Sequence, residues 1–238
     1  MDNAAHGEAG DPPAQGLVAF LRAALLAVFR RELLVPAAIL LILLTFSNVL
    51  ILSNMPSRGS SPPLAFMVAA FVRVAGLLVL AVGILRILTG SSRPRWLPDG
   101  GFWLYVLTFL ASAAASGVVA RLLGRADAVS LLLNNVLVTL LLAPLVVWFV
   151  AIAVAKPLAW TPGPWLRDLR AWLPQLLVWT LLLVTPMAVL HASIDLRLIA
   201  GAGQAFWPLA LFDGALSTLM ALVGLGLNAA AYRRVARS

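Results

Sequence analysis

The sequence predicts an all-α, polytopic membrane protein, with six transmembrane helices preceded by an interfacial amphipathic helix. Hydrophobic residues make up 62% of the 238 residues and charged residues only 11%, so the chain carries more apolar surface than a water-soluble domain of this size needs to bury. Six stretches with few or no charges are each long enough for a helix to cross the hydrocarbon core, which takes about 20 residues. No remaining segment is long enough for a soluble catalytic domain.

The N-terminal region is expected to stay outside the hydrocarbon core. Residues 1–14 form a polar segment, whereas a secretory signal needs a basic region before a short apolar core, so we expect an uncleaved, flexible tail. In residues 15–32, apolar side chains recur at helical spacing, and Arg22 and Arg30 share another face. Because Arg30 and Arg31 are costly inside lipid, we interpret this segment as a helix lying on the membrane. The alternative is an N-terminal extension of the first span.

The six spans form one transmembrane domain over residues 33–234. A run of small residues at 111–117 allows close helix packing in the third span. Pro144 lies in the middle of the fourth span, where it predicts a kink, and Pro186 breaks the fifth. We expect the spans at about residues 33–53, 64–88, 101–120, 129–155, 172–191 and 205–232.

The distribution of basic residues predicts the orientation of the chain. Cytoplasmic segments of membrane proteins are enriched in Lys and Arg. With the N-terminus inside, the inner segments hold twelve of the 17 basic residues and the outer loops hold four, so both termini are expected in the cytoplasm. The inner set is Arg22, Arg30, Arg31, Arg86, Arg93, Arg95, Lys156, Arg167, Arg170, Arg233, Arg234 and Arg237; the outer set is Arg58, Arg121, Arg125 and Arg197.

Two spans carry a charge well inside the apolar stretch, Arg73 in the second and Asp213 in the sixth. Both spans start at the expected outer face, and at about 1.5 Å rise per residue both side chains lie roughly 12–14 Å below that boundary. Opposite charges at matched depth in lipid are least costly when they pair. We therefore predict an intramembrane ion pair between Arg73 and Asp213.

Uncharged polar side chains are expected at a similar depth in the outer half of the bundle. In one interpretation they enclose a polar cavity. In the alternative they bond one another and neighbouring carbonyls, and so hold the helices together. The six residues are Asn48, Ser112, Ser116, Asn134, Asn135 and Thr185.

The net charge of +8 does not indicate nucleic-acid binding, because the basic residues flank apolar spans. In that position they fix topology and contact anionic lipid headgroups. Membrane lipids are therefore the expected partners, and nucleic acid is not. Trp160, Trp165 and Trp172, in and after the longest loop, suit the headgroup layer. The headgroup contacts are assigned to Arg22, Arg30, Arg31, Arg167, Arg170, Arg233 and Arg234.

No arrangement of residues in the sequence predicts catalysis. His191 is expected at a span end beside a loop, which leaves Ser–His chemistry without a pocket, and no Gly-x-Ser-x-Gly turn is present. Asp213 stands alone as a carboxylate within a span, whereas an intramembrane aspartyl protease needs two. Two His residues are too few for a di-haem bundle, Cys is absent, and no His–carboxylate group has the spacing of a metal site. We expect no catalytic residue, no metal and no cofactor.

The layout and the ends of the chain resemble a group of bacterial six-span proteins. The resemblance rests on FLRAALLAVFRRELLVPAAIL at 20–40, PWLRDLRAWLPQLLVW at 164–179 and ALVGLGLNAAAYRRV at 221–235. The group includes the YciC-like inner-membrane proteins and the membrane domain attached to some glycerophosphodiester phosphodiesterases. It implies the bacterial inner (cytoplasmic) membrane and an envelope or lipid-related role, but no phosphodiesterase activity, because this chain has no such domain. Arg73 and Asp213 match no motif of the group.

Two functions are weighed from these observations. The first is a non-enzymatic, membrane-organising or lipid-interacting protein, for which an accessory role in a larger complex, with a membrane-protein partner or with copies of itself, is one form. The alternative is a small permease, or a permease subunit, that uses Arg73 and Asp213. A permease predicts a flux of solute or protons that is lost when Asp213 is neutralised, whereas an accessory protein predicts bound lipid or a partner and no flux.

Overall fold

The computed structural model describes residues 16–56, 60–123, 128–201, 203 and 206–236. The polar tail expected at residues 1–14 lies outside the described residues, as do Arg58, Arg125 and Arg237. All regular elements in the described ranges are helices. In chain order they are α1 (Leu17–Val28), η1 (Arg31–Leu33), α2 (Leu34–Ser53), α3 (Leu64–Thr89), α4 (Gly100–Leu123), α5 (Ala128–Leu142), η2 (Ala143–Leu145), α6 (Val146–Val154), η3 (Gly163–Leu166), α7 (Leu169–Trp179), η4 (Thr180–Val184), α8 (Thr185–Ile199) and α9 (Phe206–Val235).

Six helical segments are long and apolar enough to cross a membrane, which confirms the predicted fold class. Each contains or overlaps one of the predicted spans, and α1 is a shorter apolar helix before them. The chain is therefore a multi-pass membrane protein. The segments are Arg31–Ser53, Leu64–Thr89, Gly100–Leu123, Leu132–Val154, Leu169–Ile199 and Phe206–Val235.

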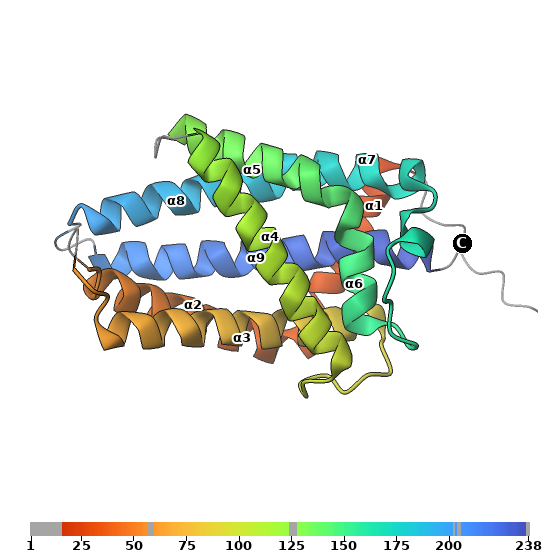
Figure 1. Ribbon diagram of the computed structural model, residues 1–238, viewed down its shortest axis with the longest axis horizontal. Coiled ribbons are helices and arrows are strands. Elements are labelled where there is room, and N and C mark those ends of the chain that lie inside the picture. The colour runs from red at the N-terminus through yellow and green to blue at the C-terminus, as the bar shows by residue number, and fades with distance from the viewer. Residues whose placement is uncertain (1–15, 57–59, 124–127, 202, 204–205, 237–238) are drawn as a thin grey trace, which may run out of the picture.

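Helix α9 is the central helix of the bundle. It contacts α1, α2, α3, α6, α7 and α8, and Figure 1 shows it running along the long axis between α8 and the α2–α3 pair. Helix α4 is peripheral and crosses the others obliquely. We call the end where α2 ends and α9 begins the cluster end, and the opposite end the C-terminal end (left and right in Figure 1).

Two prolines interrupt the helices where the sequence places them. Around Pro144 the fourth span changes to the 3-10 turn η2 between α5 and α6, so the predicted kink is confirmed. In the fifth span the π-helix η4 precedes α8, whose second residue is Pro186. Because proline lacks an N–H and its ring crowds the carbonyl four residues earlier, the regular hydrogen-bond pattern cannot pass through either point.

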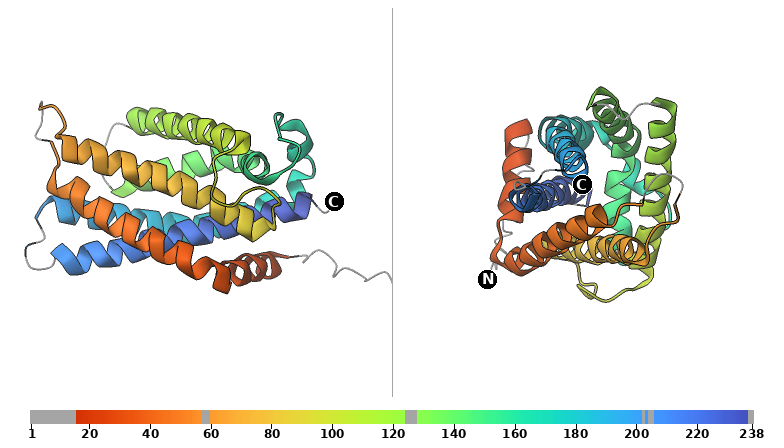
Figure 2. Two further views of the ribbon diagram at one scale, coloured as in Figure 1. Left: turned by 90° about the horizontal axis from the view of Figure 1, so that it is seen from below. Right: turned by 90° about the vertical axis from the view of Figure 1, so that its left-hand side faces the viewer.

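The fifth span extends beyond its predicted limits of 172–191 at both ends. The helical segment starts at Leu169 and continues through His191 and Asp195 to Ile199. The sequence HASIDLRLI contains no helix breaker, so the polar residues that indicated a loop lie inside α8 instead. In Figure 2, α8 and α9 lie side by side as far as the cluster end.

Helix α1 is separate from the first span, because Arg30 is extended and breaks the helix. Its apolar face packs on the bundle: Phe20 and Ala24 are fully buried, and α1 contacts α9 and α7. Gly226 of α9 permits this approach, since a Cβ there would meet the side chain of Val28. The predicted helical segment is thus present, with its apolar face against protein.

A group of three charged residues, Arg86, Arg93 and Asp99, joins helices at the C-terminal end; we call it the Arg86 latch. The guanidinium of Arg86, only 1% exposed, donates to Asp99 at 2.6 Å and to the carbonyl of Ala153 at 3.0 Å. Arg93 donates to Asp99 at 2.7 Å and to the carbonyl of Ala155. The two side chains thereby satisfy carbonyls at the end of α6 that have no helical partner. Arg86 and Arg93 are therefore packing residues, and do not simply mark a cytoplasmic loop.

Asp99 is the shared acceptor of the latch and also accepts a hydrogen bond from the backbone N–H of Phe102 in the first turn of α4, at 2.9 Å. Burial by itself would raise the pKa of Asp99, but the Phe102 N–H and the guanidinium groups of Arg93 and Arg86 outweigh it and lower the pKa from 3.8 to about 2. A lowered pKa in the folded state means that the ionised carboxylate stabilises the fold.

We predict that Asp99→Asn lowers the free energy of unfolding in detergent by about 3 kcal/mol at pH 7, because it leaves Arg86 buried without a counter-charge. In the wild type this stabilisation is complete above the unfolded-state pKa near 3.8 and is lost as the pH falls through about 2. Thermal unfolding followed by circular dichroism between pH 7 and pH 2 measures both effects. Glu32→Gln, at an exposed position, is the control; equal melting of Asp99→Asn and wild type at pH 7 would refute the role of the latch.

Candidate functional site

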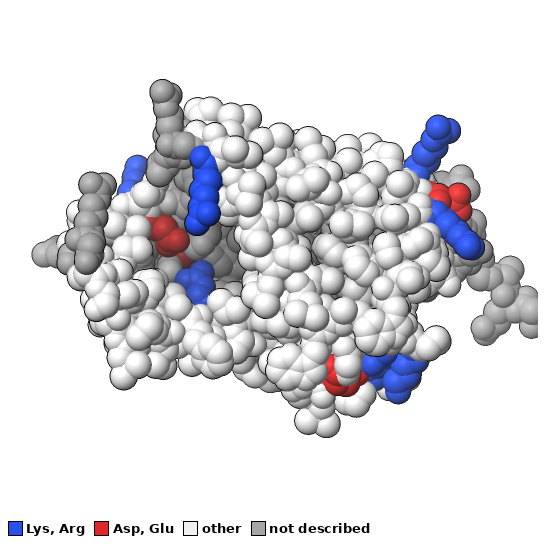
Figure 3. Space-filling view, viewed as in Figure 1, with Lys and Arg blue, Asp and Glu red and all other residues white. Residues whose placement is uncertain are grey.

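Charged and polar side chains from membrane-spanning segments gather near the cluster end, apart from the Arg86 latch. They come from four helices that are distant in sequence: α3, α8 and α9 supply the ionisable groups and α2 supplies an amide. Figure 3 shows acidic and basic side chains together in a hollow of the surface toward the left of the view, apart from the charged groups at the C-terminal end. We call this group the polar cluster: Asn48, Arg73, His191, Asp195, Asp213 and Ser217.

The amide of Asn48, a residue 3% exposed on α2, joins the charged members of the cluster. Its nitrogen donates to Asp213 at 2.9 Å and to Asp195 at 3.0 Å. Its oxygen accepts from the guanidinium of Arg73 at 2.9 Å. An amide is suited to this position, because it offers two donors to the carboxylates and an acceptor to the cation.

The close approach of α2 and α9 brings Asn48 within reach of Asp213. Gly214 follows Asp213 in α9, and a Cβ at that position would overlap the hydroxyl of Thr45, one turn before Asn48. The glycine therefore lets the two helices pack backbone to side chain beside the cluster. Small residues have this use at helix crossings in membranes, where lipid gives no hydrophobic drive to associate.

The imidazole of His191 lies between two carboxylates. Its Nδ1 is 2.5 Å from an oxygen of Asp213 and its Nε2 is 3.6 Å from an oxygen of Asp195. The Asp213 side chain is 1% exposed, whereas those of His191 and Asp195 are 20% and 29% exposed. The ring thus connects an accessible carboxylate near the end of α8 with a carboxylate that is closed off inside the bundle.

Arg73 and Asp213 lie close together, as predicted, but they do not form the direct ion pair that was predicted. Both belong to the polar cluster, but the ion pairs among the described residues do not include a direct pair between them. The Asn48 amide lies between the two charges and bonds both. The physical reason is that α2 lies beside both α3 and α9, so an amide on α2 reaches both charges.

His191 and Asp195 were missed as site residues, and Asp213 is not the isolated carboxylate that the sequence indicated. Both errors have one cause: a span limited to 172–191 puts His191 at its very end and Asp195 in the loop that follows. The signal that identifies them is their spacing, because residues four apart on a helix share a face. Ser217 has the same relation to Asp213 on α9, and both side chains reach Nδ1 of His191.

The six uncharged polar residues predicted in the outer half do not form one cavity. Asn48 belongs to the polar cluster, Ser112 donates to the carbonyl of Thr108 in its own helix, and Asn134 donates to Ser116 between α5 and α4 at 3.4 Å. Thr185 is buried at the start of α8, and Asn135 lies on α5. For Ser112, Ser116 and Asn134 these contacts fit the alternative of bonds within and between helices.

The cluster also offers three ligand atoms to a metal ion, which the sequence did not predict. Atoms of His191, Asp195 and Asp213 lie within 4.8 Å of one another. Two features of the same geometry oppose a cation there: Arg73 brings a positive charge into the cluster, and the Asn48 N–H groups already occupy lone pairs of both carboxylates. The hydrogen-bond donors and acceptors of the cluster satisfy one another.

The contact of Ser217 with His191 is a Ser–His pair, but its surroundings do not suit a nucleophile. The Ser217 oxygen is 3.2 Å from Nδ1, farther than the Asp213 oxygen that competes for the same nitrogen. Ser217 is also 4% exposed within α9. There the neighbouring backbone N–H groups are used by the helix, so they cannot stabilise an oxyanion.

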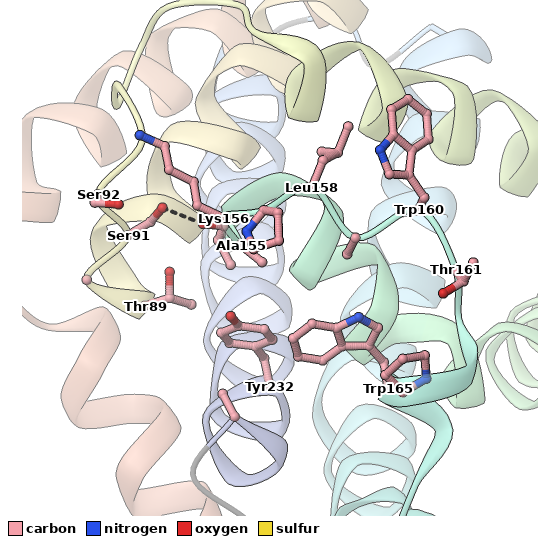
Figure 4. Close-up of a pocket in the computed structure, with 16 residues that line it drawn as sticks. Thr89, Ser91, Ser92, Ala155, Lys156, Leu158, Trp160, Thr161, Trp165 and Tyr232 are labelled. Carbon is pink, nitrogen blue, oxygen red and sulfur yellow. Dashed lines mark hydrogen bonds between the residues drawn. The ribbon is translucent and has the colours of Figure 1, made fainter.

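A second hollow lies at the C-terminal end, beyond the ends of α3, α6 and α9. This cavity of about 730 Å³ is lined by Lys156, Ser92, Trp165 and Tyr232, among others, and no acidic residue belongs to its lining. The rings of Trp165 and Tyr232 stack at 5.5 Å between centroids, and Figure 4 shows them on one side with Ser91 and Ser92 across from them. Trp172, expected in the headgroup layer, is instead fully buried.

The arginines expected at lipid headgroups lie toward the same end of the bundle. Five are exposed, near the start of the chain and around the start of α7: Arg22, Arg30, Arg31, Arg167 and Arg170. Arg233 and Arg234 are only half-exposed and hold α9 to its neighbours. Arg234 donates to the carbonyl of Ala171 at 2.8 Å and lies over the ring of Phe20 at 4.9 Å. Their headgroup contacts remain predictions.

We predict that Asn48→Leu lowers the free energy of unfolding by about 3 kcal/mol, because it leaves three charged groups in the bundle without their shared partner. Ser47→Ala is the matched control on the same helix, since the buried Ser47 hydroxyl bonds only to the carbonyl of Leu44, and its loss costs about 1 kcal/mol or less. Thermal unfolding of both variants in one detergent compares them. Equal melting temperatures for the two variants would show that Asn48 does not hold the charges together.

Comparison with known proteins gives no match: no family model, no curated protein and no solved structure matches this chain. The resemblance to bacterial six-span proteins therefore stays a prediction.

Proposed function

We propose that the protein is a small, non-enzymatic membrane permease, or the membrane-spanning subunit of one, in which the polar cluster takes up and releases a proton. The observation that carries this proposal is the position of His191 between the accessible Asp195 and the buried Asp213. Ionisable residues inside transmembrane segments are costly and commonly mark ion or proton pathways.

The geometry of the imidazole supports transfer of a proton in two steps. Each ring nitrogen faces a different carboxylate, so a proton arriving from the Asp195 side at Nε2 can be followed by release of the proton on Nδ1 toward Asp213. Imidazole is the side chain that exchanges protons most readily near neutral pH. His191 would then carry protons between the cluster end and the interior.

The charge balance of the cluster supports the same proposal. With Arg73 protonated and both carboxylates ionised, the cluster has one surplus negative charge. A surplus charge inside the membrane is costly. One proton, on His191 or on a carboxylate, makes the group neutral, whereas two protons make it positive. The charge balance of the cluster therefore favours a single bound proton.

A lipid-interacting or accessory role in the inner membrane is the second candidate, and the cavity at the C-terminal end favours it. A cationic Lys156, hydroxyl groups and stacked aromatic rings without a carboxylate suit the phosphate and glycerol parts of a lipid headgroup. If this end faces the cytoplasm, as the basic residues predict, the lipid would belong to the inner leaflet. Nothing in this cavity requires the polar cluster.

Proton flux into proteoliposomes tests the permease proposal. We expect the wild-type protein to dissipate an imposed pH gradient, followed with an internal pH dye and with potassium and valinomycin to balance charge. Asp213→Asn and His191→Gln are expected to reduce the rate to that of empty vesicles, because each removes one of the groups between which the proton moves. Asp168→Asn, a matched acid-to-amide change at an exposed position, is expected to keep the wild-type rate.

Two results would contradict this proposal. Wild-type protein that dissipates no gradient but retains phospholipid in native mass spectrometry would favour the lipid-interacting role. A stoichiometric transition-metal ion that remains with the wild type and is lost in His191→Gln would assign the cluster to metal binding instead of proton exchange.

A further inference from the structure

A small, half-open cavity lies closer to the C-terminal end of the bundle, where α5, η2, α6, α7, η4 and α9 meet. Its volume is about 240 Å³, and it is lined mostly by apolar side chains with three polar ones, Thr139, Thr180 and Asn228. Asn228 lies about 7–8 Å, or five residues at 1.5 Å each, before the Arg233 position in α9. The cavity is therefore within the apolar part of the span.

The three polar side chains at this cavity have hydrogen-bonding groups without a protein partner. In the part of the chain that the structure describes, none of the side chains of Thr139, Thr180 and Asn228 forms a hydrogen bond. A membrane interior offers no water to compensate, so each such group costs several kcal/mol if it stays unsatisfied, roughly as for any polar group moved to hydrocarbon. Three of them around one hollow therefore favour a polar occupant.

The same face of α9 connects this cavity with the polar cluster. Asp213 and Ser217 belong to the cluster, and Gly224 and Asn228 line the cavity. At 100° per residue these four positions fall within about 60° of one another around the helix. Space is present along this face as well, because a Cβ at Gly224 would meet nothing within 4 Å.

The element opposite this face is the irregular fifth span. His191 in α8 contacts the cluster half of the face, and Thr180 and Val184 of the π-helix η4 line the cavity half. Single π-helical turns occur frequently at functional sites. The break before Pro186 thus lies between the two polar regions.

We propose that this cavity is a second binding site on the transport path, which takes water or a small neutral solute with hydroxyl or amide groups. No charged residue belongs to its lining, so a charged solute has no partner there. Donors and acceptors are both available, from the Asn228 amide and two hydroxyls. That the cavity lies on a transport path rests on the proposed permease function. That the cavity holds a polar occupant does not.

Cysteine labelling tests the polar content directly, because the chain has no native Cys. Asn228→Cys and Thr180→Cys place single thiols in the cavity, and Leu219→Cys and Leu182→Cys place matched thiols on the outer surface, where the native side chains are 45% and 60% exposed. A thiol reacts only as the thiolate, which needs water. We expect methyl methanethiosulfonate to label the cavity thiols in proteoliposomes about ten-fold faster than the surface thiols that face lipid.

The outcomes separate the two occupants and the two proposals. Labelling that glycerol or urea slows assigns the cavity to a neutral solute, and labelling that neither slows assigns it to water; both support the site. Equally slow labelling at all four positions overturns it. Because labelling does not require flux, reactive cavity thiols in a protein without proton flux would refute only the permease function.

A substitution that fills the cavity tests its place on the path. Gly224→Leu is expected to slow both the labelling of Asn228→Cys and proton flux. Gly117→Leu is the matched control, because a Cβ at that glycine of α4 also meets nothing within 4 Å but α4 lies outside the cavity. Wild-type flux in a folded Gly224→Leu variant would place the cavity off the path.

Discussion

One buried amide, that of Asn48 on α2, joins charged groups of three other helices, and the polar cluster depends on it. Hydrocarbon cannot solvate a guanidinium or a carboxylate, so these groups are tolerated only where the protein supplies every partner. Asn48 supplies three of them at 2.9–3.0 Å. Gly214 removes the Cβ that would keep α2 and α9 apart beside it. Packing and charge satisfaction at this point are therefore one constraint on how α2 and α9 meet.

The two ends of the bundle use charge in different ways. At the C-terminal end, two arginines donate both to Asp99 and to backbone carbonyls at the end of α6, and the result is a fixed latch between α3, α4 and α6. At the cluster end, one imidazole lies between two carboxylates. A latch of the first kind stabilises a fold, whereas a group of the second kind can change its protonation without moving the backbone. This contrast is why we place function at the cluster end and at the α9 face that leads from it.

Hydropathy predicted the six spans and proline predicted the break at Pro144, because both follow from the local sequence and the thickness of the membrane. Contacts between helices were less accessible. Arg86 was read as a topogenic charge, although it is fully buried against α6. His191 was predicted at the end of the fifth span and Asp195 beyond it, since polar residues in an apolar chain normally mark the end of a span. Only the three-dimensional packing shows that Asp213, Asn48 and Arg73 are near enough to His191 and Asp195 to stabilise these two polar residues inside a membrane helix.

Infrared difference spectroscopy of the carboxyl groups tests the central claim most directly. Protonated carboxylic acids absorb in a region free of other protein bands, so a pH step on the reconstituted protein reports which buried carboxylates gain a proton. The account predicts a reversible carboxyl band that disappears in Asp213→Asn and shifts in frequency in Asn48→Leu, because Asn48 hydrogen-bonds that group. A band unaffected by either substitution, or no band at all in the wild type together with an unchanged imidazole signal, would contradict an exchangeable proton in the cluster.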